Sequence, residues 1–140
     1  MKETGVINRD IANAIAKQGH GDLLMVTDAG FAIPLGVEVI DLALEENKPM
    51  VLDVLAMLKK NFSVEKMVMA NQTLKISPTL FANISGAFGN GVLVETVDHS
   101  AIKEMSKNVK VVIRTGDFTA YGNVILVSGA GNRWFCENQD

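Results

Sequence analysis

The sequence predicts a single α/β domain in three layers (α/β/α), with helices on both faces of a central, mainly parallel sheet. Strand-like apolar runs alternate with helical patterns along the 140 residues, which is typical of layered α/β proteins. The run Leu23–Val26 is apolar throughout, as expected for a strand covered on both faces. A chain of this length can bury a sizeable core without disulfides or metals.

The first half of the chain alternates helices with strands. Asn8 is expected to cap a helix over Arg9–Gln18, and Gly19 to end that helix in the left-handed conformation. Pro49 fits the first turn of a second helix, which continues to about Lys60. The strands expected in this half are Leu23–Thr27, Val37–Asp41 and Glu65–Ala70.

The second half continues the alternation. Ser77-Pro78 is expected to open a helix toward Phe88, and Asp98 to cap a short helix that ends near Lys107. A polar turn separates the last two strands. The strands expected here are Gly91–Val97, Val109–Arg114 and Asn123–Val127. Residues 1–131 are therefore predicted to form the domain, and residues 132–140 a C-terminal extension that we expect to be mobile.

Composition and charge exclude several classes of function. A net charge of −3 is not the basic footprint of a nucleic-acid-binding protein. The uncharged stretch Tyr121–Asn132 is too short and too interrupted by glycine to span a bilayer. The single cysteine, Cys136, suits a reducing compartment, and residues 1–19 do not resemble a signal peptide. We therefore expect a cytoplasmic protein that binds neither nucleic acid nor membrane.

Two polar-dense stretches, residues 19–34 and 114–126, contain the residue types that hold a small polar ligand. Each places a strand-like run beside titratable or hydrogen-bonding side chains and glycines. Asp28 follows a buried strand, at the carboxyl end where ligands gather in open α/β sheets. Tyr121 and Asn123 flank a glycine at the start of the last strand.

The two histidines both lie beside predicted helix ends. Helix C-terminal carbonyls favour positive charge, so His20 is biased toward its protonated form. His99 follows the predicted cap Asp98, and Lys103 lies one helical turn further on the same face. Simpler interpretations exist for all of these residues: a surface cap, a solvated helix face, or, for Asp28, a turn residue that binds its own backbone.

No pattern for a metal or a cofactor is present. Two histidines without a Cys/His cluster do not match a zinc site. Gly86, Gly89 and Gly91 lack the preceding strand and the following Lys-Ser/Thr of a phosphate-binding loop. We therefore expect a protein that uses neither.

Taken together, the polar residues resemble the D-ribose pyranase and L-fucose mutarotase family. The resemblance extends from Gly5 to about Gly129. Its motifs are Gly19-His20, Asp28-Ala29-Gly30 with Ile33-Pro34, Asp41-Leu42, His99, Ile113-Arg114-Thr115-Gly116 and Tyr121-Gly122-Asn123. It implies cofactor-free interconversion of sugar ring forms, pyranose with furanose for ribose and anomers for fucose. It also implies a proton donor, His20, and a sugar-binding set made of Asp28, His99, Tyr121 and Asn123, with Lys103 as a neighbour.

The chemistry of these residue types agrees with that activity. Opening a cyclic hemiacetal requires a proton on the ring oxygen and the loss of one from the anomeric hydroxyl. An imidazole with a nearby carboxylate or second imidazole can do both near neutral pH, each group contributing roughly 10²–10⁴-fold.

Within the family, Asp28–Pro34 favours the ribose branch, whereas Gly19–Asp22 and Tyr121–Asn123 favour the fucose branch. We expect D-ribose as the substrate and L-fucose as the alternative. Asn71-Gln72 places amides where the ribose branch usually has acidic residues. Two other classes stay open: a non-catalytic sugar-binding accessory of ribose uptake, and a structural α/β subunit with a degenerate pocket.

The resemblance further implies a homo-oligomer, a closed ring built as a decamer of two stacked pentamers. In such an assembly the sites lie near subunit interfaces, and Tyr121 and Asn123 reach the pocket around a neighbour's His20. Closed point-group symmetry is also the usual outcome for soluble homo-oligomers.

Overall fold

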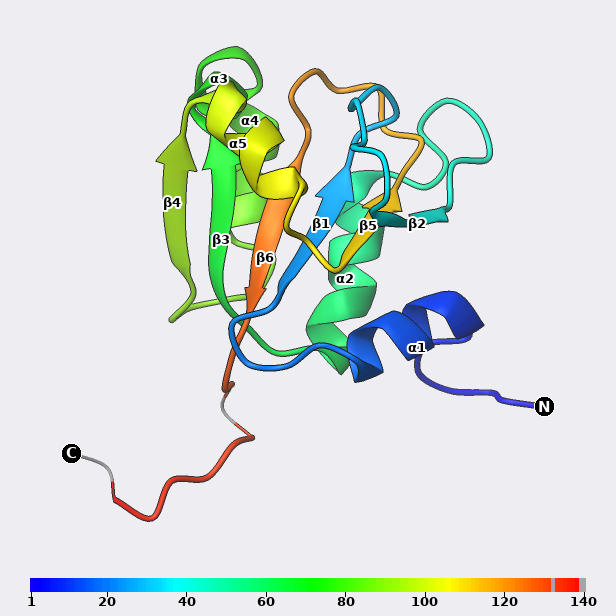
Figure 1. The fold of residues 1–140 in the computed structure, drawn as a ribbon, viewed down its shortest axis with the longest axis vertical. Helices are drawn as coiled ribbons and strands as arrows, with labels where there is room; N and C mark the ends of the chain where they lie inside the picture. The colour runs from blue at the N-terminus through cyan, green and yellow to red at the C-terminus, as the bar shows by residue number, and fades with distance from the viewer. Residues whose placement is uncertain (132, 139–140) are drawn as a thin grey trace.

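One mixed sheet organises the computed structural model, which describes residues 1–131 and 133–138. In this part of the chain the strands are β1 (Leu23–Thr27), β2 (Glu38–Asp41), β3 (Val64–Ala70), β4 (Leu93–Val97), β5 (Val111–Arg114) and β6 (Val124–Ser128). Their order in the sheet is β2-β5-β1-β6-β3-β4 (Figure 1). Only β6 runs antiparallel to its neighbours, β1 and β3; the other three pairings are parallel. The predicted mainly parallel sheet is confirmed.

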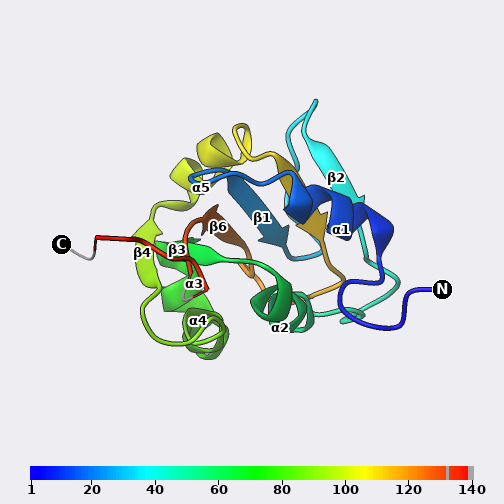
Figure 2. The same ribbon diagram turned by 90° about the horizontal axis from the view of Figure 1, so that it is seen from below.

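Helices cover both faces of this sheet. Over the described residues they are α1 (Arg9–Ala16), α2 (Val51–Asn61), α3 (Asn71–Ile76), α4 (Pro78–Ser85) and α5 (His99–Ser106). α1, α2 and α4 contribute to one hydrophobic core, and α5 contributes to a second core on the opposite face. Figure 2 shows α5 on one side of the sheet and α2 and α4 on the other. The three-layer prediction is therefore confirmed.

The central strand β1 shows why the apolar run in the sequence predicts two covered faces. Leu24 and Val26 belong to the core under α1, α2 and α4, whereas Met25 belongs to the core under α5. All three side chains are completely buried. Alternate side chains of a strand point to opposite faces, so each face needs its own apolar residues.

Two of the predicted helix caps are confirmed. The Asn8 side chain accepts hydrogen bonds from the backbone N–H groups of Asp10 and Ile11, both at 3.0 Å. The Asp98 side chain accepts one from Ser100 N at 3.0 Å. Each cap satisfies N–H groups that have no partner within the helix.

Two local predictions are wrong, and one helix was not predicted. Gly19 is not left-handed: α1 is capped by Lys17 in the right-handed region, and the chain turns at Gly21 with φ 87°. Pro49 lies before α2 rather than in its first turn, because its carbonyl accepts a hydrogen bond from Gly116 N across the fold. The short helix α3 was not expected, because no capping residue precedes it.

The extension predicted over residues 132–140 lies partly outside the described residues, which exclude 132, 139 and 140. Residues 133–138 follow β6 at the lower end of the sheet in Figure 1. No helix in the part of the chain described here is long and apolar enough to cross a membrane.

The central position of β1 gives a stability prediction. Leu24→Ala should lower the free energy of unfolding by about 2–5 kcal/mol. The substitution leaves a cavity in a fully buried part of the core, where the surrounding side chains have little freedom to fill it. Chemical denaturation at a fixed protein concentration measures this change. Leu35→Ala, at a fully exposed leucine, is the matched control and should change stability by less than about 0.5 kcal/mol. Equal losses for the two variants would contradict the assignment of β1 to the core.

Candidate functional site

A cavity of about 640 Å³ opens at the edge of the sheet where β1 and β5 end. The five residues predicted to bind a sugar all line it: Asp28, His99, Lys103, Tyr121 and Asn123. They come from segments up to 95 positions apart, so the tertiary fold brings them together. The structure therefore gathers the whole predicted binding set in one place.

The direction of the strands explains this convergence. β1 ends at this edge, so Asp28 emerges here, and β4 leads into α5, which begins with His99. β6 runs the opposite way, so its start lies at the same edge and brings Asn123 beside Asp28. The Asn123 Oδ1 atom accepts a hydrogen bond from Asp28 N at 2.9 Å.

Asp28 is buried and held by backbone amides. Its Oδ1 accepts a hydrogen bond from Gly30 N at 3.0 Å, and its Oδ2 accepts one from Gly122 N at 3.2 Å. Burial raises the pKa of the Asp28 carboxyl, and the hydrogen bonds from Gly30, Gly122 and Phe31 oppose that rise only in part. The bond to Gly30 is the turn contact of the simpler interpretation, and the same side chain also lines the cavity.

His99 stands between two aromatic rings at the start of α5. Its imidazole makes edge contacts with Tyr121, at a centroid distance of 5.0 Å, and with Phe31, at 6.1 Å. Its Nδ1 atom is buried and has no hydrogen-bond partner among the described residues. Buried polar atoms are nearly always paired, so this nitrogen is an exception among the described residues.

Gln72 and Asp98 hold the helix that presents His99. The Gln72 side chain accepts a hydrogen bond from His99 N and donates one to Asp98 Oδ1, both at 3.0 Å. Hydrogen bonds from the Ser100 hydroxyl and amide and from Gln72 lower the pKa of Asp98 to about 2. The amide at position 72 thus has hydrogen-bond partners within this chain.

The loop that contains Tyr121 is fastened to the α3–α4 region. Tyr121 has a positive φ of 56°, which is uncommon outside glycine. Its carbonyl accepts a hydrogen bond from the Thr73 hydroxyl at 2.6 Å, and the Ala120 carbonyl accepts one from the Ser77 hydroxyl at 2.8 Å. Residues with an unfavourable backbone conformation, kept in place by surrounding hydrogen bonds as Tyr121 is, are common at binding sites.

Arg114 is a cavity residue that sequence reasoning quoted only as part of a motif. Its guanidinium donates to the Ala29 carbonyl from Nε at 3.2 Å and from Nη2 at 3.0 Å. Its Nη1 also donates to both Asp41 carboxylate oxygens, at 3.0 and 3.1 Å. This role follows from strand register, since Arg114 pairs with Thr27 of β1 and with Asp41 of β2, and no local pattern in the sequence indicates that pairing.

Asp117 also lines the cavity, and no sequence signal assigned it a role. Its buried carboxylate accepts hydrogen bonds from Val51 N, at the start of α2, at 3.0 Å and from Thr119 N at 2.9 Å. Its carbonyl accepts one from Ala29 N at 2.9 Å. Asp117 therefore joins the two loops of the cavity to α2.

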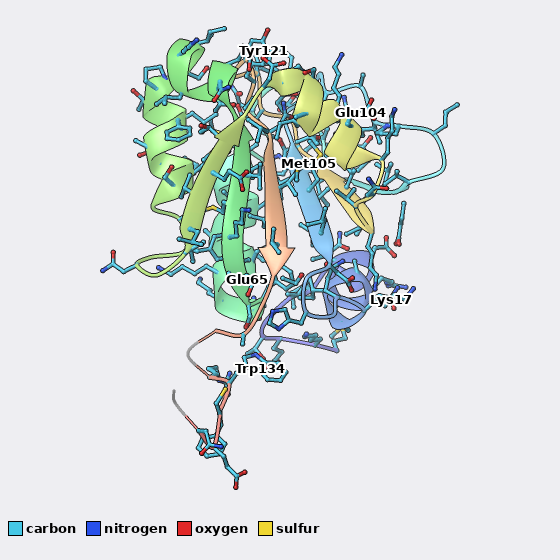
Figure 3. The ribbon with its side chains drawn as sticks, turned by 60° about the vertical axis from the view of Figure 1, so that its left-hand side comes forward. Lys17, Glu65, Glu104, Met105, Tyr121 and Trp134 are labelled. Atoms are coloured by element: carbon cyan, nitrogen blue, oxygen red, sulfur yellow. The ribbon has the colours of Figure 1, made fainter. Side chains whose placement is uncertain are left out.

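His20 does not join these residues within one chain. It precedes β1, at the opposite edge of the sheet from Asp28, and one strand of five residues spans roughly 17 Å. Its Nε2 lies 3.2 Å from Glu65 Oε2, and its side chain is 68% exposed. Figure 3 shows Glu65 at the lower end of the sheet and Tyr121 at the upper end.

A second cavity, of about 320 Å³, surrounds His20. Its lining includes Gln18, Asn61, Phe62 and Trp134. The predicted proton donor thus has a pocket of its own, separate from the binding set. In the described part of the chain, no group of three or more His, Cys, Asp or Glu residues is arranged to hold a metal ion.

Comparison with known proteins gives matches over nearly the whole chain. The model of the RbsD / FucU transport protein family matches residues 1–131. A D-ribose pyranase from Thermotoga maritima is 41% identical over 133 residues, covering 92% of this chain and 98% of that one. A D-ribose pyranase from Pseudothermotoga lettingae is 36% identical over 129 residues, 92% of each chain.

Solved structures show the same fold. Bacillus subtilis RbsD complexed with D-ribose superimposes with a TM-score of 0.89 at 34% identity, covering 94% of this chain and 99% of that one. The fucose mutarotase of Streptococcus pneumoniae in complex with L-fucose gives a TM-score of 0.70 at 18% identity, covering 89% and 94%. At that lower identity the likeness concerns the fold alone.

The Arg114 contacts lead to a prediction about the loop after Asp28. Arg114→Ala should speed amide hydrogen exchange at Ala29 and Gly30 and lower the free energy of unfolding by about 1–2 kcal/mol, because the Ala29 carbonyl loses its donors. Lys107→Ala, which removes an exposed ion pair with Glu104, is the control and should change neither quantity measurably. Unaltered amide hydrogen exchange at Ala29 in the Arg114 variant would show that the loop after Asp28 is ordered without the Arg114 hydrogen bonds.

Proposed function

Because the chain belongs to the RbsD / FucU transport protein family, we propose that it interconverts the pyranose and furanose forms of D-ribose. The observation that carries this proposal is the agreement between the cavity and the relatives. Five polar residues meet at one sheet edge, in a chain 34% identical to a protein solved with D-ribose bound. Relatives named D-ribose pyranase match over 92% of the chain.

D-ribose is preferred to L-fucose for two reasons. The identity to the ribose-complexed structure is 34%, against 18% for the fucose mutarotase. Phe31 lines the cavity and contacts the His99 ring edge to face, and we expect its ring to limit the space for a larger sugar. One additional carbon substituent in a tight pocket changes discrimination by roughly 1–3 kcal/mol.

The five cavity residues offer complementary groups to the sugar hydroxyls. The Asn123 Oδ1 is already bonded to Asp28 N, so the amide nitrogen of Asn123 is left to donate. The Asp28 carboxylate accepts hydrogen bonds from backbone amides that include Gly30 and Gly122, and its two oxygens have about four acceptor positions in all. Lys103 supplies a cationic donor, and the buried His99 Nδ1 is the group without a partner.

Ring opening in this proposal depends on His20. The imidazole gives a proton to the ring oxygen while a second group removes one from the anomeric hydroxyl, and both transfers reverse when the ring closes. Within one chain His20 is at the wrong edge of the sheet, next to Glu65. We therefore infer that the site forms between two copies, with the cavity of one chain facing the His20 pocket of the next.

A contact between different surfaces of identical chains repeats around a ring or runs on as a filament. The proposal therefore includes a closed homo-oligomeric ring, for which a decamer of two stacked pentamers is the expected form. A cytoplasmic location is part of the same proposal, because a sequence with a single cysteine, Cys136, suits a reducing compartment.

The direct test of the activity is NMR exchange spectroscopy of D-ribose. The protein should accelerate pyranose–furanose exchange, and His20→Ala should reduce the acceleration by at least about 10²-fold because the proton donor is lost. Circular dichroism should show that the exposed His20 side chain can be removed without unfolding. Ribose binding without exchange would instead identify a sugar-binding accessory, and wild-type exchange by the variant would exclude His20 as the donor.

A shared site predicts complementation between two inactive variants. Tyr121→Asn removes the ring, while asparagine still accepts the left-handed backbone at this position. Mixing it with His20→Ala, after dissociation and reassembly, should restore about a quarter of the wild-type exchange, because random pairing combines two intact halves at that frequency. Each variant reassembled alone is the control. A mixture that stays inactive would place the complete site within one chain.

A further inference from the structure

Trp134 lies beyond the part of the chain that the family model matches, which ends at residue 131. It is the only tryptophan of the sequence. Its indole nevertheless lines the cavity that contains His20. Figure 3 shows Trp134 at the same end of the sheet as Glu65 and opposite Tyr121. The extension thus adds an aromatic side chain to the pocket of the proposed proton donor.

Hydrogen bonds fasten the segment that leads to Trp134. Gly129 N donates to the Ser63 carbonyl at 3.2 Å, which binds the end of β6 to the α2–β3 connection. Trp134 N donates to the Gly131 carbonyl at 3.0 Å and closes a tight turn. Trp134 lines the cavity together with Phe62 and Ser63.

The Trp134 side chain is largely exposed and is therefore accessible to a ligand. Trp134 is 70% exposed, so it is not part of either hydrophobic core. The other walls of its cavity mix apolar groups, such as Phe62, with the polar side chains of Gln18, Asn61 and His20. A pocket with aromatic side chains and several polar groups is suited to a molecule with an apolar face and polar edges.

A monosaccharide has that character, because its ring presents C–H groups on one face and hydroxyls around its edge. Resting on the function proposed above, we propose that Trp134 packs against the C–H face of the sugar whose ring oxygen His20 protonates. Trp134 is then a substrate-positioning residue that increases affinity for ribose without taking part in proton transfer. The binding set of the neighbouring chain holds the hydroxyls, and the indole closes the site from the His20 side.

The test uses Trp134 as its own reporter. Titration of the wild-type protein with D-ribose should change the tryptophan emission saturably, with a midpoint equal to the KM for ring exchange when ribose dissociates faster than its ring opens. Trp134→Ala should raise KM about two- to tenfold and leave kcat within about twofold, as expected for a lost aromatic contact outside the proton-transfer steps. Trp134→Phe, which keeps an aromatic face, should recover most of the affinity.

Phe135→Ala is the matched control. Phe135 is the next residue, is 83% exposed and does not line the His20 cavity, so its loss should leave KM unchanged. If the wild-type protein exchanges ribose but its emission does not respond, or Trp134→Ala has the wild-type KM, the role of Trp134 is wrong and the proposed function stands. If Trp134→Ala dissociates the oligomer in sedimentation, the indole is a subunit contact and this inference also fails. Absence of exchange in the wild-type protein would instead refute the proposed function itself.

Discussion

The candidate site depends on one reversed strand. β6 lies between the parallel neighbours β1 and β3 and runs against both, so the start of β6 meets the end of β1. The hydrogen bond between Asn123 Oδ1 and Asp28 N joins them directly. If β6 were parallel, the polar loop before it would lie at the other edge of the sheet. The binding set would then be divided between the two edges.

The loops of the cavity are held by side chains that do not need a ligand to be ordered. The Thr73 hydroxyl donates to the Tyr121 carbonyl, and the Ser77 hydroxyl donates to the carbonyl of the preceding residue. Asp117 connects the loops to α2 by accepting a hydrogen bond from its first amide. Arg114 holds the Ala29 carbonyl from the neighbouring strand. A site held in this way loses little conformational freedom on binding, so the binding energy goes into recognition and orientation.

The two edges of the sheet have different chemistry. The carboxyl edge of β1 has a buried carboxylate, a cation and an imidazole nitrogen without a partner among the described residues, whereas the opposite edge has an exposed histidine beside Glu65 and an indole. The predicted proton donor and the predicted hydroxyl-binding groups therefore lie at different edges. In the proposed function, association of copies brings the two edges together, so the site is complete only in the oligomer.

Local patterns in the sequence determined most of the elements and two of the helix N-caps. The apolar run of β1, the caps Asn8 and Asp98 and the alternation of helices with strands depend on neighbouring residues, and all are confirmed. The resemblance also selected a binding set that meets in one cavity. Only the tertiary structure decided the reversed place of β6, the position of Pro49 ahead of α2, the role of Arg114 and the separation of His20 from Asp28. The physical reason is that strand order and sheet edges arise from pairing between distant segments, which periodicity and capping along the chain do not encode.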